Sequence, residues 1–366
     1  MLTRREFRGI DRPFLFAALA LLIIGFLSLY SASFQKSQAL GVSYLNRQMT
    51  WAALGILLAI VLVVVDYHRW LEWGYMLYGL NLLMLILVLG LGTVRGGAQR
   101  WLSIEGFTIQ PSELAKITTI LALARYLGAR REMAAFGWRS FFFASLFLIG
   151  PVGLILLQPN FGTASVFVVI TAAMLLVWGI PFKVLWTLIF LGLSFIPVGW
   201  WLLADYQRSR LMVFLNPNLD PLGAGYTVVQ SRISIGSGFL WGKGWLAGTQ
   251  NQLNFLPERH TDFIFSVVGE EWGFFGTTLC FVLFAILFYR GILIATQTRD
   301  PFGRLLVIGL VVMLAIHFVV NTGMTLGLMP VVGLPLPFLS YGGSWLLTCL
   351  TAVGMILSVS IRRPVF

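Results

Sequence analysis

The sequence predicts an all-α integral membrane protein with ten transmembrane helices, both termini in the cytoplasm and one long structured loop on the outer face. Three observations support this prediction. The 366-residue chain is 58% hydrophobic and only 11% charged, whereas in soluble domains about a quarter of the residues are charged. Apolar runs of about 20 residues, the length of a helix that crosses a bilayer, recur along the chain. Lys and Arg concentrate in alternate connecting segments, as the positive-inside rule requires.

The predicted spans follow the apolar runs, and we treat residues 1–366 as a single polytopic membrane domain. The runs are about 13–34, 47–65, 71–92, 111–128, 141–158, 163–180, 183–203, 263–290, 304–328 and 340–361. If the N-terminus lies in the cytoplasm, the inner segments hold most of the 25 Lys and Arg residues, and the C-terminus is cytoplasmic too. Topology therefore explains the net charge of +11, and no nucleic-acid partner is needed. The first run has no cleavage site after it and is expected to be an anchor.

Residues 204–262 form the one long connection, on the predicted outer face between the seventh and eighth spans. Unstructured loops of this length are uncommon in compact proteins. Disordered segments also lack the aromatic residues found here, which are Phe214, Tyr226, Phe239, Trp241, Trp245 and Phe255. We therefore expect the loop to fold onto the membrane surface, with a short amphipathic helix over residues 226–235 lying at the interface.

The fourth predicted span begins QPSELAK, with two ionisable residues in its first turns. An ionisable residue inside a span marks a functional site by default. Glu113 and Lys116 are three positions apart, so on a helix they share a face and can pair. Each such residue near a helix centre costs about 2.5–3.5 kcal/mol. The pair is either a structural clamp or part of a polar cavity open to the outer face, and the residues alone leave both alternatives open.

Two further segments contain polar residues at membrane depth. The tight outer turn QPNFGT, residues 158–163, is an ordinary Pro and Gly turn, but Gln158 is a candidate hydrogen-bond donor to a cavity. The segment PVVGLPLPFLSYGGS, residues 330–344, is too rich in Pro and Gly for a lipid-facing helix. Broken backbone at this depth is tolerated only where it is buried or lines a cavity, so we expect a substrate-facing re-entrant segment that includes Ser340 and Tyr341. His317, inside the ninth span, is expected to be a packing residue.

The stretch LPERHTD, residues 256–262, places Asp262 at the lip of the eighth span. A carboxylate there can stay ionised beside water or a cation and suits the role of general base. Arg and Lys recognise phosphate, so a basic funnel above a hydrophobic cavity suits an anionic, lipid-linked substrate. The cations predicted for that funnel are Arg208, Arg210, Lys243 and Arg259. No zinc-ligand spacing, Gly-rich phosphate loop or Ser-His-Asp set is apparent.

Glu270 and Glu271 follow Asp262 in the same apolar run. Consecutive helical positions point to different sides, so at most one of the two can face the cavity. We expect both to act as packing or supporting groups and not as catalysts.

Several long motifs together resemble the SEDS family (shape, elongation, division and sporulation proteins), and most closely its rod-shape branch. The resemblance extends nearly end to end. Its motifs are GAQRWL (97–102), QPSELAK (110–116), QPNFGT (158–163), DYQRSR (205–210), DPLGAGY (220–226), GKGWLAGTQ (242–250), LPERHTDFIF (256–265) and PLPFLSYGGS (335–344). The family commonly has Asp where this chain has Asn160, which argues against a catalytic carboxylate at that position.

The resemblance implies a peptidoglycan polymerase of the bacterial cytoplasmic (inner) membrane. It implies lipid II as substrate, a class B penicillin-binding protein as membrane partner, and other elongation-complex proteins as further partners. Asp262 would be the essential carboxylate, with Glu113 and Lys116 as a paired site. The mechanism that we expect is an inverting glycosyl transfer at the outer leaflet. No cofactor is certain, and a divalent cation (Mg²⁺ or Mn²⁺) beside a carboxylate and a diphosphate stays an open alternative. Two other functions also stay open: a lipid II flippase, and a scaffold for a penicillin-binding protein.

Overall fold

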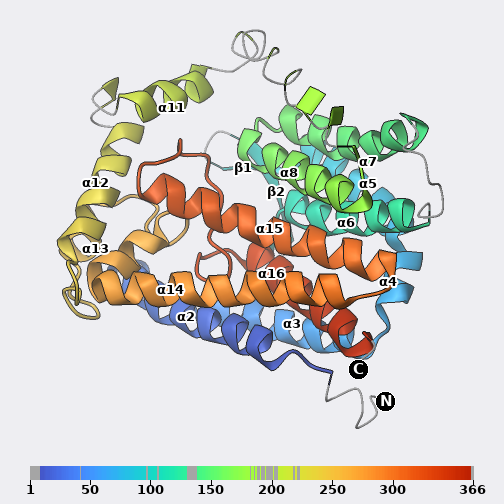
Figure 1. The fold of residues 1–366 in the computed structure, drawn as a ribbon. Helices are drawn as coiled ribbons and strands as arrows, with labels where there is room; N and C mark the ends of the chain where they lie inside the picture. The colour runs from blue at the N-terminus through green and yellow to red at the C-terminus, as the bar shows by residue number, and fades with distance from the viewer. Residues whose placement is uncertain are drawn as a thin grey trace.

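The computed structural model describes residues 9–363 except 42, 96–97, 105–106, 130–137, 182, 185, 188–189, 191–193, 195–200, 202–204, 217–218 and 221–222. Its long helices run alongside one another as a bundle (Figure 1). They are α2 (Arg12–Leu40), α3 (Tyr44–Val64), α5 (Gly74–Leu91), α6 (Pro111–Gly128), α7 (Trp138–Leu157), α8 (Phe161–Trp178), α14 (Ile264–Gln297), α15 (Pro301–Thr325) and α16 (Gly343–Arg362). The start of α2 and the end of α16 meet at one end of the bundle, where the Ser360 hydroxyl donates to the Gly9 carbonyl at 2.9 Å.

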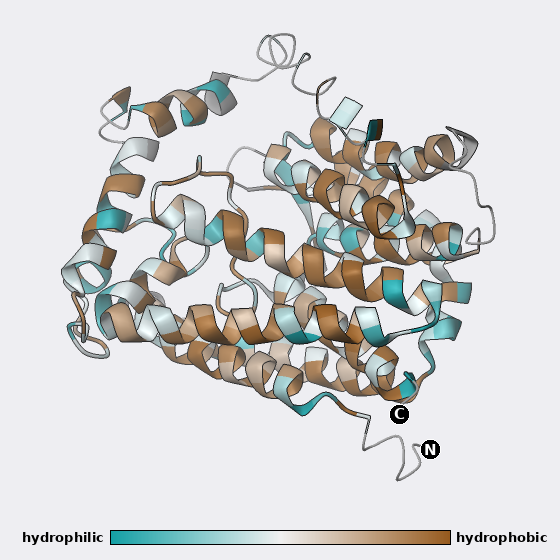
Figure 2. Ribbon diagram, viewed as in Figure 1, coloured by the Kyte–Doolittle hydropathy of each residue, from teal (hydrophilic) through white to brown (hydrophobic). Residues whose placement is uncertain are grey.

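Seven described helices are long and apolar enough to cross a membrane: α2, α3, α5, α8, α14, α15 and α16. The chain is therefore a multi-pass membrane protein, and Figure 2 shows how brown, hydrophobic residues dominate these helices. α6 and α7 occupy two more of the predicted ranges. α6 is less apolar because it contains Glu113, Lys116 and Arg125. The predicted span 183–203 lies largely outside the described residues. The count of ten, the orientation and the single-domain division stay predictions.

A small β-sheet corrects the all-α prediction. The strands β1 (Thr93–Arg95), β2 (Ala98–Ile104) and β3 (Phe107–Ile109) form an antiparallel sheet in the order β1-β2-β3 between α5 and α6. Leu102 pairs with Ile109 across it. The dipeptides Gly96-Gly97 and Glu105-Gly106 stand between the strands in the sequence. Glycine-containing pairs of this kind are signals for hairpins. They were overlooked because the segment lies between two apolar runs of membrane-spanning length and was treated as a simple connection.

In the part of the long connection that the structure describes there are three helices: α11 (Asp205–Leu215), α12 (Ala224–Ser237) and α13 (Thr249–Gln252). α12 covers the predicted helix 226–235 and packs on α14. Small polar residues allow this close approach, because the Ser231 and Ser266 hydroxyl oxygens are 2.7 Å apart. In Figure 1, α12 and α13 lie at the end of the bundle opposite the start of α2.

α14 contains a sharp break at Gly273, whose φ is 63° and ψ is −154°. The break leaves backbone groups without helical partners, and residues 239–244 supply replacements. Phe274 N donates to the Phe239 carbonyl at 2.8 Å, and Lys243 N donates to the Glu270 carbonyl at 3.0 Å. The segment therefore holds the two halves of α14 in a fixed relation.

Gly273→Ala is expected to lower the free energy of unfolding by about 1–3 kcal/mol or more, because this region of backbone space is essentially restricted to glycine. A Cβ atom at Gly273 would also collide with the Gly242 backbone nitrogen. Unfolding of purified protein in detergent measures the loss. Gly79→Ala is the control, since nothing lies within 4 Å of a Cβ there. Equal stability of the two variants would contradict the account of the break.

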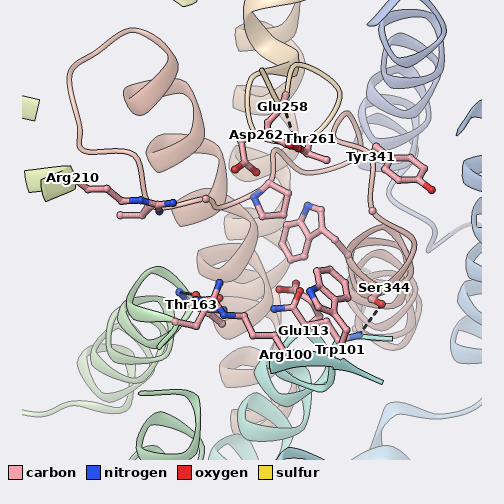
Figure 3. Close-up of a pocket in the computed structure, with 17 residues that line it drawn as sticks. Arg100, Trp101, Glu113, Thr163, Arg210, Glu258, Thr261, Asp262, Tyr341 and Ser344 are labelled. Atoms are coloured by element: carbon pink, nitrogen blue, oxygen red, sulfur yellow. Dashed lines mark hydrogen bonds between the residues drawn. The ribbon is translucent and has the colours of Figure 1, made fainter. Parts of the chain in front are cut away.

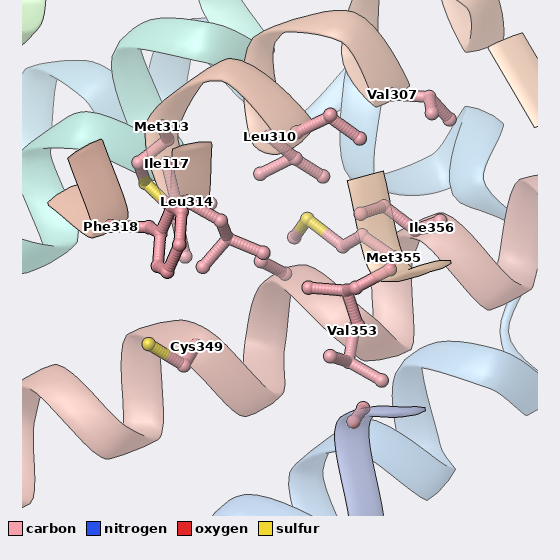
Figure 4. Close-up of a cluster of buried hydrophobic side chains, with 14 of the residues drawn as sticks. Ile117, Val307, Leu310, Met313, Leu314, Phe318, Cys349, Val353, Met355 and Ile356 are labelled. Atoms are coloured by element: carbon pink, nitrogen blue, oxygen red, sulfur yellow. The ribbon is translucent and has the colours of Figure 1, made fainter. Parts of the chain in front are cut away.

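α16 runs through the centre of the bundle, since 94% of its most apolar 18 residues are buried. Figure 4 shows apolar side chains of α15 and α16 packed together with Ile117 of α6. Phe318 of α15 is 9% exposed, and Cys349 and Ile356 of α16 are fully buried. The three helices α6, α15 and α16 pack on one another, and residues of α6 and α16 line the polar pocket.

Candidate active site

A polar pocket of about 310 Å³ lies where segments from six parts of the chain converge. Three carboxylates and two arginines are among its lining residues (Figure 3). The set is Arg100, Trp101, Gln110, Glu113, Asn160, Thr163, Arg210, Glu258, Thr261, Asp262, Val332, Gly333, Pro335, Tyr341, Gly342, Ser344 and Trp345. Residues of both charges around one cavity can bind an anion and also take up a proton.

Asp262 lies just before α14 and lines the pocket. Its backbone carbonyl accepts a hydrogen bond from Asn321 Nδ2 at 2.8 Å, and the carbonyl of Thr261 accepts one from the Ser340 hydroxyl at 2.6 Å. Burial, and then the negative charge of Glu258, raise the pKa of Asp262 to about 6, while Arg210 acts in the opposite direction. The loop is thus held on two sides and presents a carboxylate of raised basicity to the pocket.

The Pro-rich segment predicted to be re-entrant forms one wall of the pocket. Val332, Gly333 and Pro335 line the cavity, and Gly333 has a φ of 71°. A Cβ there would lie 3.4 Å from Asp262 Oδ2. Of the two residues predicted from this segment, Tyr341 lines the pocket, whereas Ser340 lies behind it, where its hydroxyl accepts from Leu336 N at 2.8 Å.

Glu113 lines the pocket, and Lys116 lies fully buried behind it. Lys116 Nζ is 2.7 Å from Glu113 Oε2 and 2.9 Å from His317 Nε2. It also lies 4.4 Å from the centre of the Trp345 ring, within the range of a cation–π interaction. The two residues form an ion pair, and Glu113 also lines the pocket. His317, expected to be a packing residue, stacks on Trp345 and also contacts the lysine.

Of the four predicted funnel cations, Arg210 alone is among the pocket-lining residues. Arg208 Nη2 donates to the Trp201 carbonyl at 2.9 Å. Arg259 is buried, and its Nε donates to the Ala32 carbonyl at 2.8 Å. Lys243 Nζ lies 2.8 Å from Glu270 Oε1. The structure therefore does not bring these three residues to the pocket.

Three more predicted residues also lie away from the pocket. Gln158 Nε2 donates to the Leu85 carbonyl at 3.2 Å, so this side chain joins α5 to the turn before α8. Glu270 is buried and accepts from Gln250 N at 2.9 Å. Glu271 is also buried and accepts from Asn251 Nδ2 at 3.1 Å. Both glutamates hold the long connection to α14, which agrees with the supporting role expected for them.

Sequence reasoning missed the contribution of β2. Arg100 and Trp101 line the pocket, and Arg100 is anchored to the 158–160 turn through the carbonyls of Gln158, at 3.0 Å, and Pro159. The available signal was the motif GAQRWL, which combines a cation with an aromatic residue. No group of three or more His, Cys, Asp or Glu side chains forms a metal site in the part of the chain that the structure describes.

The fold and the pocket define a class: a polytopic membrane protein with a pocket that combines carboxylates and arginines. The family model described as Cell cycle protein, FTSW_RODA_SPOVE, matches residues 12–364. The chain belongs to this family, which is the SEDS family that the motifs indicated.

Two similar proteins are named for the same activity. "Peptidoglycan glycosyltransferase MrdB" of Escherichia coli (strain K12) is 38% identical over 355 residues, which cover 97% of this chain and 94% of that protein. "Peptidoglycan glycosyltransferase RodA" of Treponema pallidum (strain Nichols) is 34% identical over 426 residues, which cover 96% of this chain and 98% of that protein.

Two solved structures share the fold. A crystal structure of the Thermus thermophilus rod shape determining protein RodA is 32% identical, covers 97% of each chain and superposes with a TM-score of 0.73. A chain from a study of the "structural coordination of polymerization and crosslinking by a peptidoglycan synthase complex" is 34% identical, covers 97% and 98%, and reaches a TM-score of 0.84.

Proposed function

We propose that this protein is a peptidoglycan glycosyltransferase that polymerises lipid II at the outer leaflet of the bacterial cytoplasmic (inner) membrane during cell elongation. The observation that supports it most is Asp262, a carboxylate of raised pKa in a pocket that also contains Arg210 and Arg100. The names of the relatives from Escherichia coli and Treponema pallidum agree with this activity.

In the proposed reaction, Asp262 takes the proton from the 4-hydroxyl of the acceptor GlcNAc. The hydroxyl oxygen attacks the anomeric carbon of the donor MurNAc from the opposite side to the leaving group, so the configuration inverts. The bond from that carbon to the phosphate oxygen breaks, and undecaprenyl diphosphate leaves with the electron pair. General-base assistance contributes about 10²–10⁴-fold. Arg210 and Arg100 are placed to stabilise the charge that develops on the diphosphate.

The proposal includes the topology and the partner. Ten spans and cytoplasmic termini place the loop 204–262 and the mouth of the pocket on the outer face. A class B penicillin-binding protein would cross-link the strands that this chain makes, which agrees with the likeness to a peptidoglycan synthase complex. Lipid tails would remain in the bilayer between spans while the head group enters the pocket.

Reconstitution with purified lipid II tests the function. The protein is purified with its penicillin-binding partner, the transpeptidase is blocked with a β-lactam, and glycan strands are separated on a gel. We expect polymer from the wild-type protein. Absence of polymer together with transfer of fluorescent lipid II across liposome membranes would support the flippase alternative. Polymer made at the same rate without a functional Asp262 would support the scaffold alternative, with the partner as polymerase.

The rate should depend on pH through Asp262. A general base must be deprotonated, so kcat/KM is expected to be level above pH 6 and to fall about tenfold for each pH unit below it, since the pKa of Asp262 is about 6. Glu258→Gln removes a negative charge that raises this pKa and should move the acidic limb to lower pH. An acidic limb that does not move in this variant would contradict the assignment.

A further inference from the structure

His317 of α15 is buried at the base of the pocket and is not itself among its lining residues. Its Nε2 atom lies 2.9 Å from Lys116 Nζ, and its Nδ1 atom lies 3.2 Å from the Pro335 carbonyl oxygen. The ring stacks on Trp345 with centroids 3.9 Å apart. One side chain thus contacts α6, α16 and the Pro-rich wall.

The partners of His317 determine which ring nitrogen holds the proton. A carbonyl oxygen can only accept a hydrogen bond, so Nδ1 must donate to Pro335. In the neutral ring, Nε2 is then an acceptor with its lone pair toward Lys116. A protonated ring would instead place two cations 2.9 Å apart in a buried site, which is costly. The neutral ring with its proton on Nδ1 is therefore the form that fits.

This acceptor completes the surroundings of Lys116. The lysine donates to Glu113 Oε2 at 2.7 Å and to His317 Nε2 at 2.9 Å, and it lies over the Trp345 ring. A buried ammonium group needs several such partners to remain where it is. Without His317, Lys116 has one fewer acceptor and can shift, together with Glu113.

His317 contacts two residues of the pocket lining and is linked to a third. Pro335 and Trp345 touch it directly, and Glu113 is linked through Lys116. In Figure 3, Glu113 lies across the pocket from Asp262. One turn along α15, Asn321 Nδ2 donates to the carbonyls of Asp262 and Leu334, each at 2.8 Å. One face of α15 therefore supports both sides of the pocket.

We propose that His317 is a positioning residue for glycosyl transfer: as the hydrogen-bond acceptor of Lys116, it holds Glu113 and Trp345 in the geometry that the reaction needs across from Asp262. This inference rests on the proposed function. It assigns His317 no contact with substrate and no proton transfer to the sugars.

Two substitutions separate the hydrogen bonds from the packing. His317→Phe keeps an aromatic ring against Trp345 but removes both hydrogen bonds. His317→Gln can accept from Lys116 through its amide oxygen and donate to Pro335 through its amide nitrogen. Because misplacement of a reacting group by about 1 Å can cost about 10²-fold, we expect His317→Phe to lower kcat by about 10–100-fold with little change in KM. We expect His317→Gln to recover most of the rate.

A double-variant cycle tests whether His317 acts through Lys116. Rates are measured with lipid II, the partner bound and the transpeptidase blocked, and are normalised to protein that elutes as a monodisperse complex. In the Lys116→Met background, the change His317→Phe should cause no further loss, because the donor is already gone. If His317→Phe alone does not fold, the comparison is made in the Glu113→Gln, Lys116→Met background, which lacks both charges of the buried pair.

Full activity of His317→Phe, failure of His317→Gln to recover activity, or losses that multiply in the double variant would each overturn the inference. Wild type and Asp262→Asn run in parallel keep this result apart from the proposed function. No polymer from wild type contradicts the proposed function, whereas polymer from wild type with an unaffected His317→Phe contradicts only the role of His317.

Discussion

Asp262→Asn is expected to lower the rate of glycan polymerisation by about 10²–10⁴-fold, the range that general-base catalysis contributes. The amide has nearly the shape of the carboxylate but cannot take up the proton of the acceptor hydroxyl. The backbone contacts that hold the loop do not involve the altered side chain, since Asn321 and Ser340 bind the carbonyls of Asp262 and Thr261. The fold should therefore survive, and the loss should appear in kcat.

The measurement is the initial rate of strand formation from lipid II by the complex with the penicillin-binding partner. Glu72→Gln is the matched control, because it removes an exposed carboxylate that is not among the pocket residues. We expect its rate to equal that of the wild type. A rate for Asp262→Asn within a few-fold of wild type would show that Asp262 is not the base. Retained elution with the partner checks that the variant is folded.

The effect of Asp262→Asn should also remove the acidic limb of the pH profile. In the wild type that limb reflects a carboxyl group of pKa about 6. An asparagine does not titrate, so any residual rate should be independent of pH across this range. A limb that persists near pH 6 in the variant would assign the titration to a different residue.

Much of the fold was predictable because the bilayer imposes it. A helix that crosses hydrocarbon needs about 20 apolar residues, and that constraint is local in sequence, so most spans coincide with helices. The sheet at residues 93–109 was missed because its strands are only three to seven residues long. Two glycine-containing dipeptides were its only signal, and they resemble those of an ordinary loop.

Site residues were predictable where their position at the start of an apolar run was enough to place them at the pocket. Asp262 and Glu113 both begin apolar runs and both line the pocket. Arg259 also lies near a predicted boundary and Lys243 lies within the long loop, yet each is turned toward a partner distant in sequence, the Ala32 carbonyl and Glu270. Charge and membrane depth identify candidates, but the direction of a long side chain depends on tertiary contacts that one sequence does not show.

Lys116→Met is expected to lower the free energy of unfolding by about 3–5 kcal/mol, which is the usual cost of breaking a buried ion pair by removing one partner. The substitution leaves Glu113, a buried carboxylate with 4% of its surface exposed, without the cation 2.7 Å away. Glu113→Gln in the same protein removes the uncompensated charge. We therefore expect the double variant Glu113→Gln, Lys116→Met to recover most of the lost stability.

Titration with SDS from detergent micelles measures unfolding of the four proteins in this cycle, and Lys183→Met, at an exposed position, is the control for loss of a lysine. The sign of the coupling is what distinguishes the explanations. If Lys116 contributes only packing, the double variant should be at least as unstable as Lys116→Met, because the glutamine adds nothing to the vacated space. Recovery of stability requires that charge compensation dominates, since Glu113→Gln changes charge with almost no change in volume.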